Sequence, residues 1–238
     1  LGLLPLLAFV LFAAAQVRIE GLIADSGWVP PTLESLFPAL ADRPLLALAV
    51  YVVVLDFGEY WRHRFQHRFG WWWALHALHH SQRHMTMWSD NRNHLLDDVL
   101  VATVFALLAR LIGVEPGQFV AITVITQLHE SLQHANLRLG FGRLGERLLV
   151  SPRFHRLHHS IGIGHESDGR GTLGGHNFGV LLPVWDILFR TANFDNRFDA
   201  TGVRDQLPEE GGRDYGHGFL QQQWLGLVRF FASFRRAT

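Results

Sequence analysis

The chain has 238 residues, no cysteine, and 21 acidic residues balanced by 21 basic residues, all of them arginine. The lack of cysteine excludes disulfides, iron–sulfur clusters, thiolate-ligated haem and zinc sites with cysteine ligands. Zero net charge gives no reason to expect a nucleic acid as partner. The unusual quantities are 15 histidines, eight tryptophans and 18 phenylalanines. Because the chain starts with Leu1 rather than methionine, we expect further residues upstream.

Four apolar runs follow one another along the chain, at residues 1–17, 44–55, 99–114 and 119–128. Each run is shorter than the roughly 20 apolar residues of a transmembrane helix, so a buried helix of a soluble protein is the alternative. Two features favour the membrane. Five tryptophans crowd residues 61–88, as in an interfacial belt, and residues 56–94 hold five arginines against two in residues 18–43.

The positive-inside rule places the arginine-rich residues 56–94 in the cytoplasm. If each run crosses, the four runs form two hairpins, with Glu115-Pro116-Gly117 as the turn of the second. Every histidine-rich segment then lies on the cytoplasmic side. We therefore predict an all-α integral membrane bundle of about four transmembrane helices in two hairpins, with a cytoplasmic histidine-rich cap. The arginine bias is typical of a GC-rich genome, which predicts a bacterial inner membrane.

The first histidine motif, DFGEYWRHRFQH, follows the second apolar run. Asp56, Tyr60, His63 and His67 fall on one continuous stripe of a helix. His63 and His67 have the spacing of metal ligands, and Asp56 and Tyr60 are placed to fix the tautomer of an imidazole. The motif alone is weak evidence, because two surface histidines often have this spacing by chance.

A stronger motif occurs twice, as HALHHS at residues 76–81 and HRLHHS at residues 155–160. Positions i, i+3 and i+4 share one helix face, so the three histidines of each copy should converge. Six convergent imidazoles predict a metal site. The alternative, two solvated basic helix ends, gives no reason for the recurrence. The predicted ligands are His76, His79, His80, His155, His158 and His159.

Between the two copies lies TQLHESLQHAN, residues 126–136. His134 and Glu130 are four residues apart and share a helix face, whereas His129 lies about 140° round the helix. We predict His134 as a ligand and Glu130 as a weak, water-mediated or outer partner, with His129 as the alternative ligand. No role follows for the remaining histidines, which are His84, His94, His165, His176 and His217.

The segments after the second copy carry little chemistry. GRGTLG, residues 169–174, matches a dinucleotide fingerprint but lacks the strand before it and the helix after it. Residues 192–218 read as a polar cytoplasmic loop. Residues 219–236 predict an amphipathic helix that either contacts anionic lipid or packs on the protein. Its apolar face consists of Leu220, Trp224, Leu227, Val228 and Phe231.

The order of these motifs resembles the fatty acid hydroxylase/sterol desaturase superfamily of integral membrane non-haem di-iron enzymes. The matching stretches are DFGEYWRHRFQH, LHALHHS, QHAN, SPRFHRLHHS and HNFGVLLPVWDILFRT. The resemblance covers the chain from about residue 45 to its end. It departs in a Gly-rich loop before Asn-Phe-Gly and in FRT, where the family more often has Phe-Gly-Thr. We read one domain over residues 1–238, with the histidine core at about 45–191 and a C-terminal loop and helix at 192–238.

The resemblance implies a lipid hydroxylase or desaturase that uses O2 to oxidise an unactivated C–H bond of a fatty acyl, sterol or related isoprenoid substrate. It implies two iron ions as cofactors, with zinc as a substitute in purified protein, and no catalytic residue beyond the metal centre. Electrons come from an external donor such as a ferredoxin, a cytochrome b5-like protein or a reductase. The implied iron ligands are His63, His67, His76, His79, His80, His134, His155, His158 and His159.

Two other functions stay open on the sequence. A di-zinc membrane hydrolase can use the same imidazoles, although it normally keeps a carboxylate ligand and a general base. A non-catalytic metal-binding or transport protein places histidine or aspartate within its membrane spans, whereas the histidines of this chain cluster at the ends of the runs.

Overall fold

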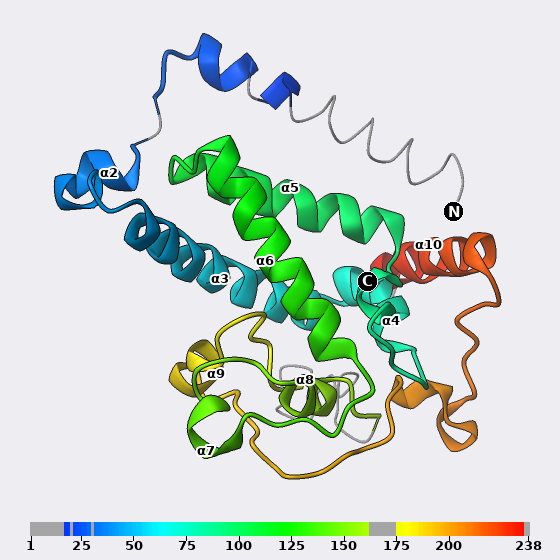
Figure 1. Ribbon diagram of the computed structural model, residues 1–238. Coiled ribbons are helices and arrows are strands. Elements are labelled where there is room, and N and C mark those ends of the chain that lie inside the picture. Colours follow the sequence, from blue (N-terminus) through cyan, green and yellow to red (C-terminus); the bar gives the residue numbers. More distant parts are fainter. Residues whose placement is uncertain (1–16, 20, 30, 162–174, 236–238) are drawn as a thin grey trace. The chain divides into compact units, whose positions relative to one another are not determined.

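The computed structural model describes residues 17–19, 21–29, 31–161 and 175–235 (Figure 1). All regular elements in these residues are helical, and an isolated antiparallel bridge joins Ser160 to Thr201. The all-α prediction is therefore confirmed for the part of the chain that the structure describes. The first predicted apolar run, residues 1–17, and the GRGTLG loop lie outside it, apart from Val17.

The long helices correspond to the apolar runs and the histidine motifs. They are α3 (Pro44–Arg68), α4 (Gly70–His80), α5 (Leu95–Leu111), α6 (Pro116–His134) and α10 (Phe219–Arg235). Shorter α-helices are α2 (Leu33–Leu36), α7 (Gly142–Gly145), α8 (Pro152–His158) and α9 (Val184–Leu188). The described residues also form the 3₁₀ turns η1 (Pro38–Leu40), η2 (Ser89–Asn91), η3 (Arg204–Gln206) and η4 (Pro208–Glu210).

Helix α3 extends well beyond the second apolar run and carries the first histidine motif in its last turns. Its 25 residues make it the one described helix long and apolar enough to cross a membrane. Only 33% of the most apolar 18-residue stretch of α3 is buried inside the structure, whereas the core helix of a soluble protein is mostly buried. By its length and exposure, α3 is a candidate membrane helix.

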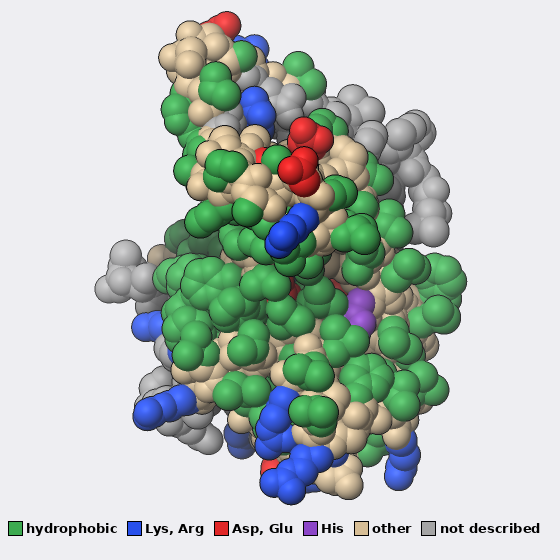
Figure 2. Space-filling view, turned by 60° about the vertical axis from the view of Figure 1, so that its left-hand side comes forward, with side chains coloured by type: hydrophobic (Ala, Val, Ile, Leu, Met, Phe, Trp, Pro, Cys, Tyr) green, Lys and Arg blue, Asp and Glu red, His purple; other side chains and the backbone are tan. Residues whose placement is uncertain are grey.

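Many large hydrophobic side chains are exposed on α3 and α6, and hydrophobic side chains make up much of the face in Figure 2. Large contiguous apolar patches on soluble monomers usually mark a contact with a partner or a membrane. The exposed residues include Leu45, Val53, Val54 and Phe57 on α3, and Val120, Val124, Ile125 and Leu128 on α6. Among the described helices only α3 is long and apolar enough to span a membrane, so the four predicted spans stay a prediction.

The chain forms two compact units. The first contains residues up to Gly58 and Leu95–Thr123, and the second contains Glu59–His94 and Val124 onwards. The core of the first unit consists of Tyr51, Leu55, Ala109, Val114 and Ile122. All nine histidines predicted as ligands belong to the second unit.

In the second unit, α10 packs along α4 (Figure 1). The His94 ring donates to the Gln223 carbonyl (2.9 Å), and the Arg229 guanidinium donates to the Ala74 carbonyl (3.2 Å). A side chain at Gly226 would collide with the His94 ring, so glycine permits this close approach. The predicted apolar face is turned away from the contact, with Trp224 65% exposed. The helix therefore packs on the protein by one face and presents the other outward.

Candidate metal centre

Nine buried histidines lie in two groups, and within each group the candidate ligand atoms are within 4.8 Å of one another. The five-histidine group consists of His63, His67, His76, His80 and His158. The four-histidine group consists of His79, His134, His155 and His159. None of the nine is more than 7% exposed. The two groups contain all nine histidines that the sequence predicted as ligands and, among the described residues, no carboxylate.

Each HxxHH motif divides its histidines between the two groups, which the sequence did not predict. In α4, His76 and His80 join the five-histidine group with their Nε2 atoms 3.2 Å apart, and His79 joins the other group. The second motif has the opposite division, because His155 and His159 form the pair (Nε2–Nε2 3.1 Å) and His158 crosses over. An i,i+4 pair thus serves one group, and the i+3 histidine, turned to one side on the helix, reaches the next.

The two groups are in direct contact. The rings of His80 and His159, which belong to different groups, are stacked with centroids 4.3 Å apart. The rings of His79 and His80, neighbours in the sequence, are 5.4 Å apart. Two cations held by the two groups would therefore be close neighbours, as in two-metal sites.

Ring nitrogens in the four-histidine group converge in a way that hydrogen bonding alone does not satisfy. The Nδ1–H of His134 donates to the Glu130 carbonyl (2.8 Å), which leaves a lone pair on Nε2 in the neutral ring. This Nε2 lies 3.1 Å from Nε2 of His79 and 3.0 Å from Nε2 of His155, and the latter is also 3.1 Å from Nε2 of His159. Each ring nitrogen offers either one proton or one lone pair, so hydrogen bonds cannot satisfy all three contacts at once, whereas a cation fits the converging lone pairs.

In the four-histidine group, burial favours the neutral form of His79 and His155, which is the form that binds a metal. Burial lowers the pKa of His79 well below its ordinary value, and neighbouring histidines, His134 first, lower it further. The pKa of His155 is lowered for the same reasons. The buried rings thus offer lone pairs at neutral pH, without protons that a cation would have to displace.

In the five-histidine group, two rings are oriented by backbone carbonyls from one short segment, residues 176–179. The Nδ1–H of His63 donates to the Phe178 carbonyl (3.0 Å), and the Nδ1–H of His158 donates to the His176 carbonyl (2.8 Å). In a neutral imidazole this leaves Nε2 as the lone-pair atom. Sequence reasoning missed these partners because any residue can supply a carbonyl. The only signal was the presence of HNFG in the family-like stretch.

Asp186, on α9, holds this segment in place. Its fully buried carboxylate accepts hydrogen bonds from the N–H groups of Phe178 (2.8 Å) and Gly179 (2.7 Å) and from the Thr191 hydroxyl (2.6 Å). Burial raises the pKa of Asp186 to about 6, and the three donors oppose that rise. The carboxylate is therefore mostly ionised at neutral pH, when its hydrogen bonds are charge-assisted.

The residues predicted as outer partners of the ligands, Asp56, Tyr60 and Glu130, lie in different surroundings. The Tyr60 hydroxyl contacts the Thr191 hydroxyl (3.0 Å) and accepts from Arg64 (3.1 Å). Glu130 reaches His134 through its backbone carbonyl. Asp56 is buried on α3. The alternative ligand His129 belongs to neither group.

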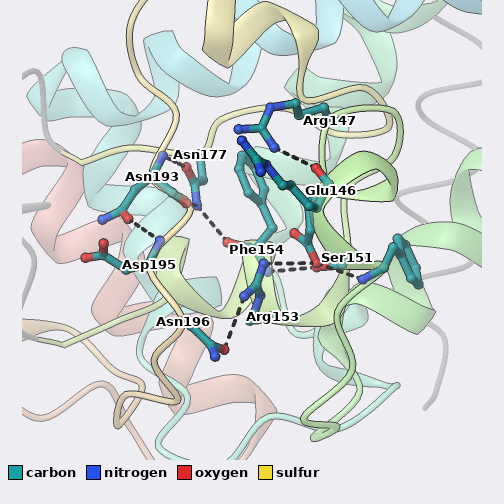
Figure 3. A network of polar contacts seen from close by, with 11 residues as sticks. Glu146, Arg147, Ser151, Arg153, Phe154, Asn177, Asn193, Asp195 and Asn196 are labelled. Atoms are coloured by element: carbon teal, nitrogen blue, oxygen red, sulfur yellow. Dashed lines mark hydrogen bonds and ion pairs between the residues drawn. The ribbon is translucent and has the colours of Figure 1, made fainter.

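Helix α8, which carries the second HxxHH motif, is fixed at its start by capping. The Ser151 side chain accepts from the Phe154 N–H (3.1 Å), and Pro152 occupies the first helical position. Figure 3 shows the surrounding contacts, in which the Asn177 amide donates to the Phe154 carbonyl (2.9 Å) and Arg153 reaches Asn196 (3.2 Å). These contacts connect the backbone of α8 to the segments that follow the second motif.

The chain is similar to a known protein family and to individual proteins of that kind. The model of the family described as fatty acid hydroxylase matches residues 48–191. An ornithine lipid hydroxylase of Rhizobium tropici is 29% identical over 64% of this chain and 43% of its own length. The human alkylglycerol monooxygenase is 28% identical over 68% of this chain and 34% of its own. A Delta(7)-sterol 5(6)-desaturase of Gibberella zeae is 26% identical over 48% and 35%. The chain spans less than half the length of each of these relatives, and no solved structure matches it significantly.

Proposed function

The chain belongs to the fatty acid hydroxylase family, and on that premise we propose that it is a membrane oxidoreductase. It uses O2 and electrons from an external donor to hydroxylate, or alternatively desaturate, an unactivated C–H bond of a lipid. The observation that carries this proposal is the pair of adjoining histidine groups, each with at least four buried imidazoles and no carboxylate among the described residues. A di-zinc hydrolase, by contrast, normally keeps a carboxylate ligand.

The nine histidines of the two groups would hold two iron ions, and zinc is the expected substitute in purified protein. Bound iron would supply the redox chemistry that activates O2, which no amino-acid side chain here provides. The protein's part is to present lone pairs from fixed tautomers and to keep water away from the two groups by burying the rings. The sequence has no flavin, nicotinamide or haem motif, so a ferredoxin, a cytochrome b5-like protein or a reductase delivers the electrons.

The relatives support a lipid as the substrate. Their names specify an ornithine lipid, an alkylglycerol and a sterol, which share extended hydrocarbon but differ in their polar parts. Two of the three are named as a hydroxylase or a monooxygenase, so hydroxylation is the first expectation. We propose a fatty acyl, sterol or isoprenoid substrate that reaches the site from the bilayer.

The membrane arrangement is part of the proposal. Helices α3, α5 and α6 and the first apolar run would form four spans in two hairpins, within one domain that covers residues 1–238. The arginine distribution favours a histidine site on the cytoplasmic face of a bacterial inner membrane. The exposed apolar surface of α3 and α6 supports contact with lipid tails.

Incubation of the reduced iron-loaded enzyme with membrane lipids and ¹⁸O₂ tests the activity. We expect a lipid product that contains one labelled oxygen and forms only when an electron donor is supplied, as mass spectrometry would detect. A desaturated lipid, with the label in water, would identify the second reaction type. The His79→Ala protein is the control and should form neither product. Oxygen derived from water, or lipid cleavage without a reductant, would contradict the proposal and favour a hydrolase.

A further inference from the structure

Two ligands of the five-histidine group share a support that lies outside the ligand set. We propose that residues 176–179 select the metal-binding tautomers of His63 and His158, and that Asp186 and Asn177 are the positioning residues that hold this segment. Asp186 acts on His63 through the intervening peptide group, in place of a direct carboxylate–histidine bond. The inference rests on the proposed two-metal centre.

The first relay runs through the peptide group that joins Phe178 to Gly179. The N–H of this group, on Gly179, donates to Asp186 Oδ2 (2.7 Å), and its carbonyl, on Phe178, accepts from His63 Nδ1 (3.0 Å). In a trans peptide the N–H and C=O point in opposite directions, so the carboxylate and the imidazole lie on opposite sides of one planar group. The negative charge polarises that group and makes its carbonyl a stronger acceptor.

A second relay of the same form serves His158. The peptide group that joins His176 to Asn177 donates through its N–H to the Thr191 carbonyl (2.9 Å) and accepts from His158 Nδ1 (2.8 Å) through its carbonyl. Thr191 is also the residue whose hydroxyl donates to Asp186. The two rings supported in this way come from α3 and α8, yet their centroids are only 4.4 Å apart. Residues 176–179 therefore determine which ring nitrogen carries the proton in both His63 and His158, which lie side by side in the five-histidine group.

Asn177 fixes the backbone between the two accepting carbonyl groups, those of His176 and Phe178. Its φ of 59° lies in the left-handed region, which non-glycine residues rarely occupy. The side-chain amide donates to the carbonyls of Phe154 and Asn193 (2.9 Å each) and accepts from the Asn193 N–H (2.6 Å). These three hydrogen bonds, all to buried or partly buried backbone, hold a conformation that the chain would otherwise leave.

Gly179 shows that the carboxylate must come close to the backbone. A Cβ at this position would lie 2.8 Å from Asp186 Oδ2 and 2.9 Å from the Leu182 carbonyl. Any side chain there would push the carboxylate from the N–H groups that it accepts from. The sequence thus provides glycine where the relay requires contact between Asp186 and the main chain.

The test uses Co²⁺ as probe with the detergent-purified full chain and follows its visible absorption during titration. The wild type should bind two equivalents. Asp186→Asn should weaken one of the two by roughly 10- to 100-fold, the usual effect of losing a partner of a metal-bound histidine, and leave the other unchanged. The substitution keeps the size of the side chain but gives a neutral amide, whose NH₂ cannot accept from an N–H. Asp205→Asn, which removes a carboxylate that bonds Tyr215 and Arg213, is the control and should bind like the wild type.

Asn177→Gly provides an independent variant if Asp186→Asn does not fold. Glycine keeps the left-handed backbone accessible but removes the three amide hydrogen bonds, so the same selective weakening is expected. Two wild-type affinities in either folded variant, or equal weakening of both equivalents, would overturn the positioning role. A wild type that binds fewer than two equivalents would instead overturn the two-metal centre itself, and the relay with it.

Discussion

Replacing His79 or His158 with alanine should abolish lipid oxidation and remove much of the bound metal. The two histidines come from different motifs and lie in different groups, so each substitution removes a nitrogen from a different metal position. Loss of a partner outside the ligand set already costs roughly 10- to 100-fold in affinity or activity, so the loss of a ligand should cost more than about 100-fold in turnover. Metal analysis together with the ¹⁸O₂ assay measures both effects.

The matched control is His84→Ala. His84 is exposed and belongs to neither group, so its removal should leave metal content and turnover unchanged. Helical content by circular dichroism should be the same in all three variants, because neither ligand side chain forms a helix cap by itself. Normal metal content and turnover in both His79→Ala and His158→Ala would show that the assigned ligands are wrong.

A cysteine at Gly117 should react with an impermeant thiol reagent in intact cells, whereas a cysteine at Glu209 should react only after the cells are opened. Gly117 lies at the start of α6, after the turn of the second predicted hairpin, and Glu209 lies in η4, beyond the histidine motifs. Both residues are exposed. These 238 residues contain no cysteine, so in this chain only the introduced cysteine can react. The positive-inside rule supplies the direction of the expected difference.

The reverse pattern, with Glu209 labelled in intact cells and Gly117 protected, would invert the topology and place the histidines outside the cytoplasm. Equal labelling of both residues in intact cells would show that α6 does not cross the membrane. The family assignment would survive either result, because it rests on the match over residues 48–191 rather than on sidedness.

All nine histidines that gather in the two groups could be selected from the sequence, because helical spacing shows which side chains share a face; their role as metal ligands stays a prediction. His63 and His67, and the two HxxHH copies, could be selected from periodicity before any contact was known. The same reasoning preferred His134 over His129, and the structure brings His134 into the four-histidine group. The all-α fold class was likewise predicted from the apolar runs.

The division into five and four histidines could not be predicted in this way. Helical spacing predicts that His76, His79 and His80 point to one side of α4. Which of the two groups each histidine joins depends on how α4 packs against the other histidine rings. The carbonyl partners of His63 and His158 were equally hidden, because main-chain acceptors have no sequence signature. The apolar run 44–55 and the helical stripe of the first histidine motif were read as separate features, and the structure joins them in one helix that ends at Arg68.

The most direct test of the central claim is metal analysis of the full chain purified anaerobically under reducing conditions, followed by reconstitution of the metal-free protein with iron or with zinc. Two ions should bind per chain, and only the iron form should oxidise lipid when O2 and an electron donor are present. One ion per chain, or full activity with zinc alone, would contradict the account.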